Sequence, residues 1–143
     1  MTTSAITHLA VLPHALPACP NARVALFAIR RIGGHGLLDA RAAHALFTAF
    51  GESFRRPLLL VRTLMADIAT SSAGPISIAP CCCARATHAE LALLTILARV
   101  ETQPEKARLL LADMLGIRAV DGVLASAAAV AMAFADEGRP VVV

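Results

Sequence analysis

Three adjacent cysteines, Cys81, Cys82 and Cys83, concentrate the unusual chemistry of a chain that contains four cysteines in all. They follow Pro80 and precede Arg85, just ahead of a predicted helix start. Successive side chains of extended backbone point to opposite sides, so Cys81 and Cys83 should face one way and Cys82 the other. Two thiols on one side can share a soft cation, or they can form a disulfide when an oxidant removes two electrons.

A metal site built on the triplet needs donors from elsewhere in the chain. Cys19 and His88 are the available soft donors, so the predicted ligand set is Cys81, Cys82, Cys83, His88 and Cys19. Thiolate and imidazole ligands suit Zn(II), Cu(I) or an iron–sulfur cluster. Ordinary structural zinc sites use separated pairs of ligands, and no second such pair is present here. The spacing of the cysteines therefore does not decide between Zn(II), Cu(I) and an iron–sulfur cluster.

The triplet also fits a thiol site that responds to oxidants. A thiolate is stabilised near a helix N-terminus and beside a cation, and Thr87 and Arg85 are predicted to supply these two influences. Oxidation of such a thiol next to other cysteines ends in a disulfide. A Cys81–Cys83 bond, or a bond to Cys19, is sterically easier than one between adjacent cysteines. We expect a thiolate site of one of these two kinds, without catalytic turnover.

A second function class is also consistent with the sequence. Free cysteine packs well as a small hydrophobic residue, so the triplet could serve structure alone. The protein would then be a helical interaction module, with the alanine-rich segment 122–137 forming a homodimer contact.

The composition predicts an all-α, single-domain fold. Hydrophobic residues make up 57% of the 143 residues, much of this is alanine, and there are five Phe but no Trp or Tyr. Alanine is the best helix former, and the chain is long enough to bury a core of its own. We expect a Pro-containing flexible leader over residues 1–20 and a helical domain over residues 21–140. The helices of this bundle of about six are predicted at 22–32, 38–50, 54–70, 91–100, 103–115 and 122–137.

One long loop, residues 71–87, carries the triplet, and loops of this length in small domains are usually functional or disordered. Thr87 and Glu90 form a Ser/Thr-x-x-Glu capping box that predicts where the following helix begins. Gly33 and Gly34 are predicted to end the first helix, because glycine readily adopts the left-handed C-cap conformation.

Charge and hydropathy limit the partners. The net charge of +3 is too small to indicate a nucleic-acid interface. No apolar run reaches the roughly 18–20 residues that span a bilayer. The first 22 residues contain no Lys, Arg, Asp or Glu and several prolines, which is unlike a signal peptide. We therefore expect a cytoplasmic protein, in which the cysteines are thiols.

Five short segments stand out along the chain: HGLLDA (35–40), FGESFRRP (50–57), APCCC (79–83), VDGVLA (120–125) and FADEGRP (134–140). Together they resemble a small bacterial family known as a domain of unknown function. The resemblance extends over roughly Arg30 to Pro140 and leaves the leader outside. It implies a single domain and carries no activity with it.

Overall fold

The computed structural model describes residues 12–143. Its helices are α2 (Pro20–His35), α3 (Ala40–Phe50), α4 (Arg55–Ser71), α5 (His88–Arg99), α6 (Pro104–Leu115) and α7 (Asp121–Asp136). A 3-10 turn, η1 (Gly51–Phe54), joins α3 to α4. Two short strands, β1 (His14–Ala15) and β2 (Arg85–Ala86), pair antiparallel. The predicted all-α class is confirmed.

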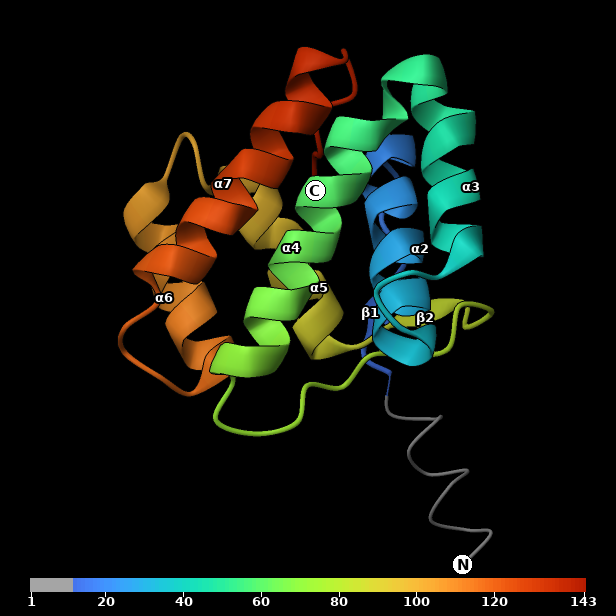
Figure 1. Cartoon of the computed structure of the whole chain (residues 1–143). Helices are drawn as coiled ribbons and strands as arrows, with labels where there is room; N and C mark the ends of the chain where they lie inside the picture. Colours follow the sequence, from blue (N-terminus) through green and yellow to red (C-terminus); the bar gives the residue numbers. More distant parts are fainter. Residues whose placement is uncertain (1–11) are drawn as a thin grey trace, which may run out of the picture.

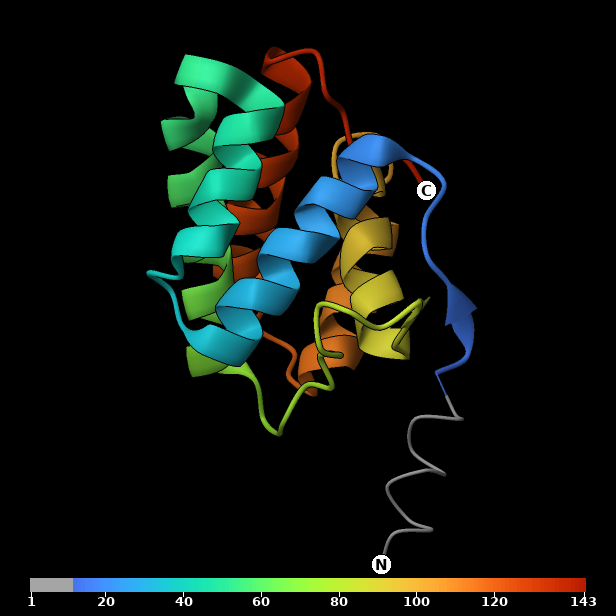
Figure 2. The same cartoon turned by 90° about the vertical axis from the view of Figure 1, so that its right-hand side faces the viewer.

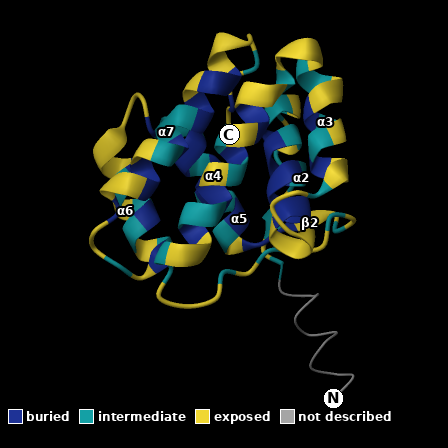
Figure 3. Cartoon of the chain, in the orientation of Figure 1, coloured by how far each residue is buried: buried dark blue, intermediate teal, exposed yellow. Residues whose placement is uncertain are grey.

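The helices pack around one hydrophobic core. In Figure 1, α4 and α7 lie side by side with α3 next to α4, and Figure 2 shows α2 passing between this group and α5. Buried positions of each helix face their neighbours, and exposed positions line the outside (Figure 3). The largest fully buried side chains include Phe134, Ile29, Leu46, Leu64, Leu94, Ile96, Leu111 and Leu115. None of the helices described is long and apolar enough to cross a membrane.

The predicted end of the first helix at Gly33 and Gly34 is wrong. Helix α2 continues to His35 and ends at Gly36, whose φ of 108° is the conformation that glycine favours and whose N–H bonds to the Ile32 carbonyl. Each glycine inside a helix costs about 1 kcal/mol relative to alanine. That cost is offset because Ile32 is buried in the core and Ile78 packs on Gly33, where an added Cβ would lie 3.4 Å from its side chain.

Helix α3 begins two residues later than predicted because Asp39 caps it. The Asp39 carboxylate accepts the Ala42 N–H at 2.9 Å and two hydrogen bonds from the Arg31 guanidinium of α2, at 2.8 and 3.0 Å. The hydrogen bonds from Arg31 are the main reason why the pKa of Asp39 is held well below its ordinary value of 3.8. This contact ties the end of α2 to the start of α3.

The Asp39 cap predicts a specific acid sensitivity. A carboxyl group whose pKa is lower in the folded protein stabilises the fold fully above its unfolded pKa, and this contribution is lost as the pH falls below about 4. Replacing Asp39 with asparagine keeps a good N-cap but removes the charge. Urea unfolding measured from pH 7 to pH 3 should therefore show a shallower loss of stability in Asp39→Asn than in the wild type. Parallel curves for the two proteins would contradict this assignment.

Part of the predicted leader is described. Residues 1–11 lie outside the described residues, whereas residues 12–19 lead along the bundle into α2. Strand β1 pairs His14 with Ala86 and Ala15 with Arg85. This pairing, which the sequence did not predict, places the N-terminal segment beside the connection between α4 and α5.

Candidate functional site: the cysteine loop

The cysteine loop, residues 77–87, is closed at its base by Thr87. The predicted capping box is confirmed: the Thr87 hydroxyl accepts the Glu90 N–H at 3.0 Å, and the Glu90 carboxylate accepts the Thr87 N–H at 2.8 Å. The same hydroxyl donates to the Ser77 carbonyl at 2.7 Å. Thr87 therefore both starts α5 and joins the two ends of the loop.

A buried ion pair, Arg30 with Glu90, lies beneath the loop. The Arg30 residue is 4% exposed and Glu90 is fully buried, and two hydrogen bonds of 2.7 and 3.0 Å join their charged groups. Charges are rarely buried unless they are paired and hydrogen-bonded. Because two hydrogen bonds join the guanidinium and the carboxylate, the pair fixes the orientation of the two groups in addition to their attraction.

The pair also bonds to four backbone groups of the loop. Arg30 donates to the carbonyls of Cys83 and Arg85, at 2.9 and 2.8 Å. Glu90 accepts from the N–H groups of Ala79 and Thr87, at 3.2 and 2.8 Å. These contacts fix the backbone on both sides of the cysteines.

The three cysteines differ in exposure. Cys81 and Cys83 are half-buried and line a hollow of about 160 Å³, whose wall also includes Arg30, whereas Cys82 is exposed. The backbone is a turn, closed by the Cys83 N–H and the Pro80 carbonyl at 3.1 Å, and not the extended segment that was assumed. The grouping of Cys81 with Cys83 nevertheless agrees with the prediction. All four cysteines of the chain are free thiols.

Arg31 provides the cation beside the triplet. Its Nη1 atom lies 4.0 Å from the Cys81 Sγ atom, and the same guanidinium is held by Asp39. The hydrogen bonds with Asp39 raise the pKa of Arg31 further above its ordinary value, so the group stays charged. The cation predicted beside the triplet, Arg85, is therefore replaced by Arg31 in the structure.

The other predicted site residues lie elsewhere. His88 pairs with His14, and the Cys19 Sγ atom lies 4.0 Å from the Pro140 carbonyl. The Arg85 guanidinium donates to the carbonyls of Leu12 and Pro13. Within residues 12–143, no three His, Cys, Asp or Glu side chains lie close enough together to hold a metal ion.

Sequence reasoning missed Arg30, Arg31 and Glu90 as determinants of this site. A signal for them was present, because three arginines, Arg23, Arg30 and Arg31, interrupt an otherwise apolar helix and a buried cation requires a partner. Glu90 was recognised as a capping residue only. Its second role depends on the packing of α5 against α2.

Comparison with known proteins identifies a family for this chain, but the function of that family is unknown. Residues 4–107 match the model of a family of unknown function, DUF6628. The chain belongs to this family. The matched DUF6628 region includes the whole cysteine loop and most of the predicted leader, and it ends before α7, whereas the resemblance was expected to begin near Arg30. No curated protein and no solved structure matches the chain.

Proposed function

We propose that Cys81 and Cys83 form a dithiol that responds to oxidants, without catalytic turnover. The observation that carries this proposal is that both residues line one small hollow on a loop fixed by Arg30 and Glu90. We assign Cys81 as the attacking sulfur, because the Arg31 guanidinium lies 4.0 Å from its Sγ atom and can donate a hydrogen bond to it. Cys82 is exposed and does not line this hollow, so we give it no part in the disulfide.

The chemistry is a two-electron oxidation by a hydroperoxide. The Cys81 thiolate attacks the terminal oxygen, the O–O bond breaks, and the leaving alkoxide or hydroxide takes a proton. Cys83 then attacks the resulting sulfenic sulfur. An S–S bond forms, the S–O bond breaks, and water leaves with the proton of Cys83. An excess of a small-molecule thiol reverses the change by disulfide exchange.

Thiol titration after treatment with hydrogen peroxide tests the proposal. One equivalent should remove two thiols from protein purified anaerobically, with a mass loss of about 2 Da that maps to the peptide containing Cys81 and Cys83. Cys81→Ser and Cys83→Ser should each abolish this loss. Cys82→Ser is the matched control and should behave as the wild type. An equal effect of Cys82→Ser, or oxidation of a single thiol without formation of a disulfide, would refute the assignment.

Two other results of the same preparation would favour the alternatives. Copper or zinc bound in the anaerobically purified protein, and lost in Cys81→Ser, would favour soft-metal binding by the two thiolates. Unreactive thiols together with a concentration-dependent mass would favour the interaction module. The latter has its own supporting observation: Leu59 of α4 and Met132 of α7, two neighbouring helices, are 63% and 48% exposed.

A further inference from the structure

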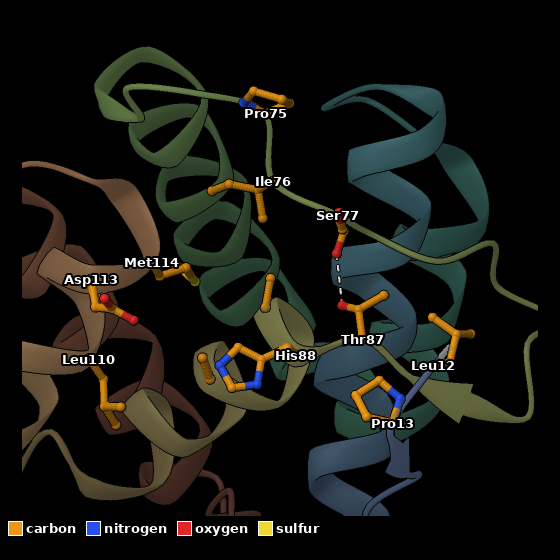
Figure 4. A pocket seen from close by; sticks show the side chains of 12 residues that line it. Leu12, Pro13, Pro75, Ile76, Ser77, Thr87, His88, Leu110, Asp113 and Met114 are labelled. Carbon is orange, nitrogen blue, oxygen red and sulfur yellow. Dashed lines mark hydrogen bonds between the residues drawn. The ribbon is translucent and has the colours of Figure 1, made fainter. Parts of the chain in front are cut away.

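A second group of potential ligands lies on the other side of the β1–β2 pairing. His14 of β1 and His88, the first residue of α5, approach each other at the edge of a cavity of about 530 Å³. Figure 4 shows the His88 ring in this cavity, between Leu110 and Asp113 of α6 on one side and Leu12 and Pro13 on the other. The oxidant-responsive dithiol does not use these histidines.

The distance between the two rings is informative. The His14 Nε2 and His88 Nδ1 atoms are 3.4 Å apart, and the ring centroids are 5.6 Å apart. Hydrogen bonds from N–H groups are usually about 2.7–3.2 Å long, so this contact is long for one. Zn–N bonds of about 2.0–2.1 Å at a tetrahedral angle place two nitrogen ligands about 3.3–3.4 Å apart. The observed spacing matches the one that two ligands of a shared ion adopt.

Both histidines are held in place without a metal. His14 lies opposite Ala86 in the two-stranded pairing, and the Arg85 side chain holds the two residues before it through the carbonyls of Leu12 and Pro13. His88 follows directly on the Thr87 capping box. Ligands fixed by the surrounding backbone lose little freedom when they bind an ion.

We propose that His14 and His88 bind a divalent transition-metal ion of the zinc type. Neutral imidazole is a common ligand for Zn(II), Ni(II) and Cu(II), and water fills the remaining coordination positions of an open site. Asp113 lines the same cavity as His88 but does not complete a three-residue ligand group with the two histidines. The nearby charge of Arg85 opposes the cation, so affinity should lie below that of a closed four-ligand zinc site. A bound ion would join β1 directly to α5.

Calorimetric titration with zinc chloride tests this site. The background carries serine at positions 81, 82 and 83, so that the triplet does not compete for the metal. We expect one equivalent of Zn(II) to bind, with at least tenfold weaker binding in His14→Ala and in His88→Ala. His44→Ala is the matched control, because His44 is an exposed histidine of α3 far from this cavity, and it should bind as the background protein does.

Thermal unfolding provides a second measurement. Zinc should raise the melting temperature of the background protein and of His44→Ala, and should leave His14→Ala unchanged, since an ion that binds only the folded state stabilises it. No saturable binding, or equal losses in His44→Ala and His14→Ala, would overturn the proposal.

Discussion

Replacing Glu90 with alanine should lower the free energy of unfolding by about 3–5 kcal/mol. Removal of one partner leaves the Arg30 guanidinium buried without a counter-charge, which is the costly half of a broken buried ion pair. The change also removes the acceptor for the N–H groups of Ala79 and Thr87. Chemical denaturation followed by far-ultraviolet circular dichroism measures the effect.

An exposed ion pair provides the control. Arg56 and Asp136 lie 2.8 Å apart, but their side chains are 53% and 55% exposed. Exposed pairs contribute about 0–1 kcal/mol, so Asp136→Ala should cost no more than that. Equal losses in Glu90→Ala and Asp136→Ala would mean that the buried pair has no special role in the fold.

The Glu90 substitution should also change the cysteines locally. Arg30 and Glu90 together fix the backbone at Ala79, Cys83, Arg85 and Thr87. Without them, Cys81 and Cys83 should react faster with an alkylating reagent under native conditions. Cys82 is exposed already, so its rate should change little.

The second large effect is expected at Phe134. This side chain of α7 is fully buried, and its ring contacts Phe50 edge-on, with centroids 4.9 Å apart. Phenylalanine-to-alanine changes in cores typically cost about 3–5 kcal/mol, because the lost burial is accompanied by a cavity. Denaturant unfolding of Phe134→Ala should show a loss of this size.

Phe47 is the matched control for Phe134. Its ring also meets another aromatic ring edge-on, that of Phe54 at 5.3 Å, but Phe47 is 48% exposed. Phe47→Ala should cost about 1 kcal/mol or less, close to the value of the aromatic contact itself. A loss in Phe47→Ala equal to that in Phe134→Ala would contradict the description of the core.

The two large predictions also separate global from local effects. Phe134→Ala and Glu90→Ala should destabilise the protein to a similar extent, but only Glu90 contacts the cysteine loop. Faster alkylation of Cys81 and Cys83 in both variants would indicate general loosening of the fold. Faster alkylation in Glu90→Ala alone would show that the ion pair itself controls the thiols.

Local rules predicted the features that depend on a few neighbouring residues. The capping box at Thr87 and the long loop before α5 follow from the residues at those positions. The failure at Gly33 has a tertiary cause, because Ile78 packs against the glycine and α2 continues past it. Propensity alone does not include that contact.

The contacts that define the site could not be read from the sequence. Arg30 and Glu90 are 60 residues apart, and their pairing depends on how α2 packs against α5. Cys19 and His88 were grouped with the triplet by chemical type alone. In the structure Cys19 lies near Pro140 and His88 lies near His14. Ligand type predicts what a residue can bind, whereas the fold decides which donors come together.

The 60-residue separation within the Arg30–Glu90 pair has a consequence for biosynthesis. A chain emerging from the ribosome exposes α2 first, with a cation whose carboxylate partner has yet to be translated. The surroundings of the thiols are completed only after α5 has emerged and docked, because contacts distant in sequence require a large loop to close. Newly made chains therefore pass through an interval in which the loop that carries the triplet lacks the contacts of the Arg30–Glu90 pair.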